Sequence, residues 1–189
     1  MATGTNDTTI ITFADISKVR PIAQNIQSDE RVQPCIVEAE RLDILPAIGA
    51  SLYRQLANAD REEEVIIIGG ISLTKSEFME ILDGGYYTDC CDNTEQYQGG
   101  LIAAISYLTY ARLILQNNIN VTAFGVVAKI NPETSEPTGD QIIIRASNQA
   151  KQTGLEILRQ CLEFLKCKKL LPCRTGSLDY KFGFKVIGD

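Results

Sequence analysis

The sequence of 189 residues contains no histidine and no tryptophan. The lack of histidine excludes Ser–His and Cys–His nucleophile pairs, histidine-ligated zinc and the usual base that titrates near neutral pH. Acid–base chemistry would fall to Asp, Glu, Lys, Tyr or Cys, whose pKa values need large shifts for that task. We therefore expect a protein that is not an enzyme, with no cofactor, no metal site and no catalytic residue.

Long apolar runs and catalytic glycine motifs are absent as well. No stretch approaches the roughly 18 apolar residues of a transmembrane helix. The N-terminal segment MATGTNDTT lacks the basic start and apolar run of a secretory signal. The phosphate-binding patterns GxxxxGKS/T and GxGxxG and the nucleophile pattern GxSxG do not occur. We expect a cytoplasmic protein that does not bind membranes.

The charge is acidic overall but unevenly distributed. The 24 acidic and 18 basic residues give a net charge of −6. Residues 1–140 hold 9 basic and 20 acidic side chains, a net −11, whereas residues 141–189 hold 9 basic and 4 acidic ones, a net +5. An acidic body argues against nonspecific nucleic-acid binding by the whole surface, and we expect no sequence-specific nucleic-acid binding, although the basic part could still contact nucleic acid or an anionic partner. The basic part could contact the acidic face of a second copy.

The six cysteines do not form a recognisable framework. They are Cys35, Cys90, Cys91, Cys161, Cys167 and Cys173, with no CxxC spacing among them. Without a secretory signal, we interpret them as reduced thiols that serve as small apolar residues.

The apolar periodicity predicts a mainly α protein, a helical bundle with two long helices and minor strand segments. The first long helix starts near Glu95 or just after Gly100 and ends near Gln116, and the second covers about 139–169. Shorter helices are expected at 13–19, from about residue 28 to an interruption at Leu45-Pro46, at 50–58, and after a Thr74–Glu77 capping box. Strands or small hairpins are expected near 65–73, 119–130 and 176–187. Residues 84–94 read as a loop, and the glycine pairs at 69/70, 84/85 and 99/100 share no flanking pattern that would make a repeat.

Three units follow from these patterns: a flexible N-terminal arm at 1–11, a helical-bundle domain at 12–171, and an extended β-like C-terminal arm at 172–189. In the last unit apolar residues from Leu178 to Val186 alternate with polar ones, which gives a strand with one aromatic and one basic face. Such a strand is either an edge strand of the domain or an arm on a neighbour, and we favour the arm. The candidate partner contacts are Tyr180, Lys181, Phe182, Phe184, Lys185, Lys168 and Lys169.

Arg112 is a single charged residue within the most apolar helix. It either forms a buried ion pair or extends its charged end to the surface, and the two readings are equally supported. Glu38, Asp43 and Glu80 are carboxylates that nothing in the sequence places near one another.

Three segments carry a resemblance to a known group. They are ERVQPCIVEAERLDILPAIGASLYRQL, GLIAAISYLTYARLILQNN and INVTAFGVVAK, with Pro34, Ala39, Gly49, Leu52, Leu56, Tyr110, Thr122, Gly125 and Lys129 as the matching positions. The chain resembles prophage proteins of Bacteroides-type bacteria, which are similar in plan to tailed-phage head–tail connector (adaptor) proteins. The resemblance implies a helical subunit that forms a homo-oligomeric ring beneath the portal, with portal and tail proteins as partners. It also implies a location in the cytoplasm during assembly and then in the virion.

A second interpretation comes from the cysteine loop. Tyr86, Tyr87, Cys90 and Cys91 could line the pocket of a small-molecule-binding protein or a cysteine-dependent enzyme. A reactive cysteine needs a lowered pKa, and no basic residue lies nearby in the sequence to provide it.

Overall fold

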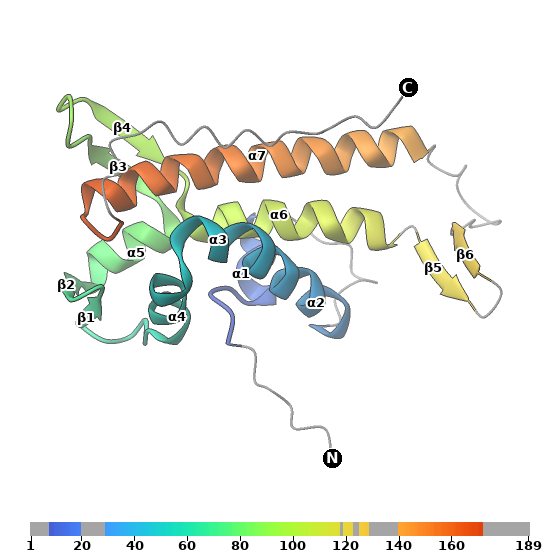
Figure 1. Cartoon of the computed structure of the whole chain (residues 1–189), viewed down its shortest axis with the longest axis horizontal. Coiled ribbons are helices and arrows are strands. Elements are labelled where there is room, and N and C mark those ends of the chain that lie inside the picture. Colours follow the sequence, from blue (N-terminus) through green and yellow to red (C-terminus); the bar gives the residue numbers. More distant parts are fainter. Residues whose placement is uncertain (1–7, 20–28, 118, 123–124, 129–139, 172–189) are drawn as a thin grey trace, which may run out of the picture.

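A computed structural model describes residues 8–19, 29–117, 119–122, 125–128 and 140–171 (Figure 1). The chain is mainly helical, as the periodicity predicts. The helices are α1 (Phe13–Val19), α2 (Asp29–Ala39), the π-helical turn η2 (Glu40–Ile44), α3 (Leu45–Ile48), α4 (Ala50–Asn58), α5 (Lys75–Asp83), α6 (Gly100–Asn117) and α7 (Asp140–Cys167). The expected C-terminal arm, 172–189, lies outside the described residues.

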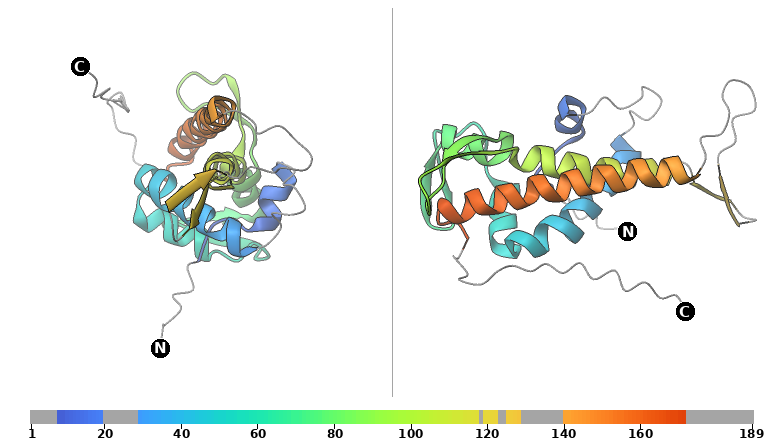
Figure 2. Two further views of the ribbon diagram at one scale, coloured as in Figure 1. Left: turned by 90° about the vertical axis from the view of Figure 1, so that its right-hand side faces the viewer. Right: turned by 90° about the horizontal axis from the view of Figure 1, so that it is seen from above.

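The long helices α6 and α7 run side by side in opposite directions along the long axis of the molecule (Figures 1 and 2). The start of α6 at Gly100 decides between the two predicted starts, and Glu95 belongs to a strand. A glycine lets the two helices approach closely, because a Cβ at Gly154 would lie 2.8 Å from Leu108 Cγ. Leu101, Ile105 and Leu108 of α6 are fully buried, so this helix forms the centre of the core.

The prediction that Leu45-Pro46 interrupts the helix is wrong. The backbone passes from α2 through η2 directly into α3, and Pro46 lies in the first turn of α3. Pro46 has no N–H to donate, and the π-helical turn before it, in which the Leu45 N–H donates to the Glu40 carbonyl, lets the chain continue as a helix. The predicted stop at Gly49 is confirmed: its φ is 83°, and its N–H donates to the Leu45 carbonyl at 2.9 Å.

Three two-stranded antiparallel hairpins complete the described chain: β1 (Val65–Ile68) with β2 (Ile71–Thr74), β3 (Gly85–Thr88) with β4 (Glu95–Gln98), and β5 (Ile119–Thr122) with β6 (Gly125–Ala128). The first and third agree with the predicted strand segments. The second corrects the prediction of a loop at 84–94. Its strands are four residues long, and β4 has no apolar alternation that sequence reading could detect.

The glycine pairs mark junctions between elements. Gly69 and Gly70 make the β1–β2 turn. The later pairs connect α5 to β3 and β4 to α6, with Gly85 as the first residue of β3 and Gly100 as the first residue of α6. Gly84 and Gly100 lie against each other, because a Cβ on Gly84 would come within 2.5 Å of the Gln98 carbonyl oxygen. A Cβ on Gly100 would come within 2.5 Å of the Gly84 nitrogen. The α5–β3 and β4–α6 connections therefore cross with their backbones in direct contact, and only glycine permits so close an approach.

The described end of the expected N-terminal arm is packed into the core. Ile10 and Ile11 are 2% and 0% exposed. The buried Glu40 carboxylate accepts hydrogen bonds from the Ile10 and Ile11 N–H groups at 2.9 to 3.1 Å and from the Tyr53 hydroxyl at 2.7 Å. Burial raises the pKa of Glu40, and these three donors oppose that shift. Residues 8–11 therefore belong to the folded domain, and residues 1–7 lie outside the described residues.

Candidate functional site

The candidate partner residues from the sequence fall into two groups. Tyr180, Lys181, Phe182, Phe184 and Lys185 lie outside the described residues. The remaining two, at the end of α7, differ from each other. Lys168 Nζ lies 3.6 Å from a Glu77 oxygen, 3.7 Å from a Glu80 oxygen and 5.5 Å from the Phe164 ring centre. Lys168 thus connects α7 to α5 within the chain, whereas Lys169 is exposed.

Arg112 forms the ion pair that was one of its two predicted roles. Its Nη2 lies 2.8 Å from Asp43 Oδ2, and its Nε lies 3.8 Å from Glu38 Oε2. The side chains of Arg112 and Asp43 are only 19% and 12% exposed. Arg112 Nη1 also donates to the Leu108 carbonyl at 3.2 Å. The arrangement ties α6 to α2 and η2, which is a structural role.

The described cysteines separate into two core thiols, one disulfide and Cys91, whose exposure does not fit the expected role as a small apolar residue. Cys35 and Cys161 are buried, as expected, and burial raises the pKa of Cys35 to about 11 and that of Cys161 to about 12. The prediction of reduced thiols is wrong for Cys90 and Cys167, which form a disulfide between the β3–β4 loop and the end of α7. A separation of 77 residues gave no sign of this pairing in the sequence.

The two tyrosines of the alternative interpretation lie on opposite faces of the β3–β4 hairpin. Tyr86 is 72% exposed, and its ring packs edge-on against Tyr97 with 5.2 Å between centres. The Tyr87 ring faces inward and packs edge-on against Phe164 at 5.0 Å. Alternation along the strand therefore separates two residues that the sequence places together.

Two groups of exposed apolar side chains stand out on the surface. The first, which we call the acidic end, consists of Val65 and Ile67 on the outer face of β1 and the preceding Glu62, Glu63 and Glu64. Val65 and Ile67 are 57% and 68% exposed. The three glutamates are exposed too, and Glu62 Oε2 pairs with Lys75 Nζ at 2.9 Å.

The second group, the basic end, lies where α6 ends and α7 begins. Leu115, Ile142 and Ile144 are 40%, 60% and 50% exposed. Arg145 beside them is exposed, and residues 141–155 contain two basic side chains, Arg145 and Lys151, and no acidic one. This end thus combines apolar and positively charged groups.

The acidic and basic ends lie at opposite ends of the long axis, with β1 at one end and the start of α7 at the other (Figures 1 and 2). Their apolar areas could each bury against a second copy. Glu62, Glu63 and Glu64 give one end its acidic groups and Arg145 gives the other its basic group, while Lys75 and the lysines that follow α7 also lie at the β1 end. The charge asymmetry is readable from the sequence, but the exposed apolar residues are not, because exposure depends on packing.

The protein is mainly helical and is built on a long antiparallel helix pair. Within the described ranges, no helix combines the length and apolar content needed to cross a bilayer. The chain belongs to a family described as a family of unknown function (DUF6712), whose profile matches residues 44–170. No curated protein and no solved structure matches the chain. The matched residues extend from η2 to beyond α7, so both ends lie within them, while α1 and α2 lie before them.

Proposed function

We propose that this protein is a structural component of a tailed-phage neck, a head–tail connector (adaptor) that acts through protein–protein contacts in a ring. The observation that carries the proposal is the placement of exposed apolar side chains at opposite ends of one long helix pair. The resemblance of three sequence segments to prophage proteins gives the biological setting.

Complementary surfaces at opposite ends favour heterologous association, in which the acidic end of one copy meets the basic end of the next. Such a contact uses two different surfaces, so an open oligomer of any length still has one unoccupied acidic end and one unoccupied basic end. If the rotation between copies closes, the result is a ring. The glutamates at 62–64 and Arg145 would bring the copies together in the correct direction, and the attraction would weaken with salt.

The partner at each end is therefore a second copy of this chain. A contact between copies would bury exposed isoleucines such as Ile67 and Ile142. Burying each would contribute up to about 2 kcal/mol at roughly 25 cal/mol per Å². Portal and tail proteins would then bind the assembled ring.

The test is sedimentation velocity of the purified full chain at high concentration, in low and high salt. We expect oligomers in low salt that dissociate with added salt. Ile67→Asp and Ile142→Asp should each abolish assembly beyond the monomer, while the matched control Asn148→Asp on an exposed position of α7 should not.

A mixture of the two variants sharpens the test. Ile67→Asp keeps an intact basic end and Ile142→Asp keeps an intact acidic end, so the mixture should form heterodimers and nothing larger. A wild-type chain that stays monomeric at high concentration and low salt would contradict self-assembly. Neighbouring portal, capsid and tail genes would support the phage setting, and a metabolic operon would contradict it.

A further inference from the structure

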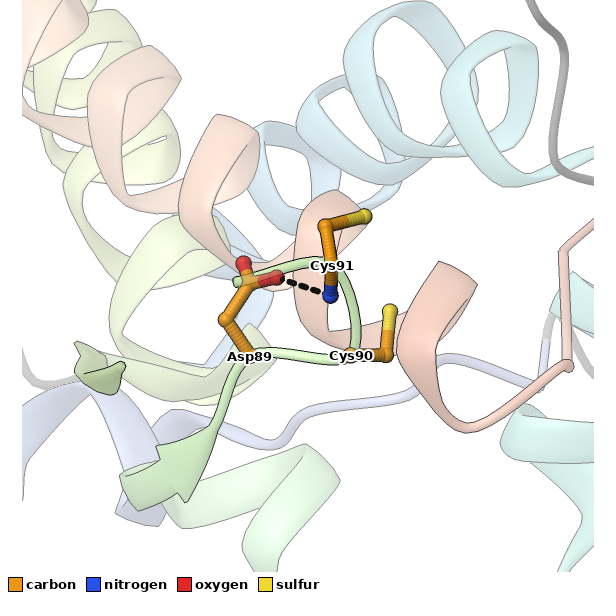
Figure 3. A group of neighbouring side chains, drawn as sticks. All are labelled: Asp89, Cys90 and Cys91. Atoms are coloured by element: carbon orange, nitrogen blue, oxygen red, sulfur yellow. Dashed lines mark hydrogen bonds between the residues drawn. The ribbon is translucent and has the colours of Figure 1, made fainter. Parts of the chain in front are cut away.

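Two cysteine sulfurs and one carboxylate lie together in the β3–β4 loop, and one of these sulfurs is bonded to a third cysteine at the end of α7. A carboxylate oxygen of Asp89, Cys90 Sγ and Cys91 Sγ all lie within 4.8 Å of one another (Figure 3). Cys167 Sγ is bonded to Cys90 Sγ and lies 3.2 Å from the Cys90 nitrogen. Two segments that are far apart in the sequence therefore supply four possible metal-binding atoms.

The loop holds these groups through its own hydrogen bonds. The Asp89 N–H donates to the Thr94 carbonyl at 2.8 Å, and the Asn93 N–H donates to the Asp89 carbonyl at 3.1 Å. Asp89 Oδ1 accepts from the Cys91 N–H at 2.7 Å, as Figure 3 shows. A carboxylate has a second oxygen and further lone pairs, so Asp89 can orient the loop and still bind an ion.

We propose that, once the Cys90–Cys167 disulfide is reduced, Cys90, Cys91, Cys167 and Asp89 bind one Zn²⁺ ion. A dithiol reductant supplies the two electrons: the S–S bond breaks, each sulfur takes up a proton, and the dithiol becomes a cyclic disulfide. Zinc then displaces one proton from each of the three thiols, so three thiolates and one carboxylate surround the ion.

The ligand set and its spacing suit this ion. Zinc prefers four ligands in a tetrahedron, with thiolate sulfur the commonest in structural sites. A Zn–S distance of about 2.3 Å places ligand atoms about 3.8 Å apart, so Asp89, Cys90 and Cys91 need a small contraction from their 4.8 Å spread, whereas Cys167 Sγ moves away from Cys90 Sγ once the bond between them is broken. Cys90 and Cys91 are exposed, which gives the ion a path to the site.

The site would keep the β3–β4 hairpin attached to α7 in a reducing compartment. Disulfides do not persist in the cytoplasm of most cells, and a bound ion can make the same connection. In the oxidised state the disulfide takes that role. The site is independent of the ends proposed for assembly, since it shares no residue with them.

The test is a cobalt titration of the reduced full chain, freed of dithiol under anaerobic conditions. We expect one Co²⁺ per chain, with the visible bands of tetrahedral cobalt and a thiolate-to-cobalt charge-transfer band, both lost on addition of Zn²⁺. The oxidised protein should not give these bands, because two of the sulfurs are in the disulfide.

Variants assign the ligands. Cys91→Ser and Asp89→Asn should each weaken cobalt binding at least about tenfold, and asparagine keeps the acceptor for the Cys91 N–H. Cys173→Ser, outside the described residues, and Cys35→Ala in the core should leave the affinity within about twofold of wild type. Folding of each variant is checked by far-ultraviolet circular dichroism. Reduced protein without the charge-transfer band, or a Cys91→Ser variant that binds like the wild type, would overturn the proposal.

Discussion

Replacing Gly100 by alanine tests the crossing of the two glycine connections. Gly100 has φ +81°, and a Cβ there would overlap the Leu82 carbonyl oxygen and lie 2.5 Å from the Gly84 nitrogen. Gly70 is the matched control, because its φ is +80° and a Cβ there would meet nothing within 4 Å. The two substitutions share the same backbone strain and differ in the steric overlap.

The expected magnitudes follow from these two effects. A non-glycine residue in the left-handed region costs about 1–2 kcal/mol, and the smaller entropy of unfolded alanine returns about 0.4–1 kcal/mol. Gly70→Ala should therefore lower the free energy of unfolding by roughly 1 kcal/mol. Gly100→Ala adds the displacement of a backbone segment, at about 1–3 kcal/mol or more. We expect Gly100→Ala to be destabilising by roughly 2 kcal/mol more than Gly70→Ala.

The measurement is urea unfolding followed by far-ultraviolet circular dichroism, since the chain has no tryptophan. Both variants and the wild type are compared under the same redox conditions, so that the disulfide makes the same contribution in each. Equal losses of stability in Gly100→Ala and Gly70→Ala would refute the reasoning, because the overlap would then have no energetic effect.

Three further outcomes are expected. Burial raises the pKa of Glu40 above its ordinary 4.5, so the stability of the wild type relative to Glu40→Gln should fall as the pH rises from 4.5 through the raised pKa. Urea unfolding midpoints measured across this pH range would show the fall, and a stability difference independent of pH would contradict the buried carboxylate. Arg112→Met should cost about 2–3 kcal/mol by leaving Asp43 without its cation, while Lys75→Met, in the exposed pair with Glu62, should cost less than about 1 kcal/mol in the same assay. In oxidised protein, Cys90→Ser should lower the free energy of unfolding by up to about 4 kcal/mol, because the disulfide closes a loop of 77 residues. The variant should match the wild type once both are reduced and a chelator has removed metal ions.

Local signals fixed many element limits. The helices Phe13–Val19 and Ala50–Asn58 occur where the pattern predicts them, since caps, glycines and apolar spacing act within a few residues. The Thr74–Glu77 capping box is confirmed at the start of α5. The failure at Pro46 has a tertiary cause, because η2 widens the helix and turns Glu40 into the core.

The candidate surfaces were harder to predict, because they depend on contacts between distant segments. The choice between two roles for Arg112 depended on carboxylates from α2 and η2 that the sequence could not bring together. The β3–β4 hairpin was missed because its strands are short and largely polar, and its position is set by packing of Tyr87 against Phe164 and by the disulfide.

The sequence by itself determined that the protein is mainly helical, that it lacks histidine chemistry and that its charge is divided between an acidic and a basic part. Composition and periodicity are local properties, so they are readable without a fold. Only the tertiary structure decided which apolar residues stay exposed, that the acidic and basic ends lie far apart, and that Cys90 meets Cys167. Each of these depends on which distant segments bury one another, and that is settled by packing across the whole core.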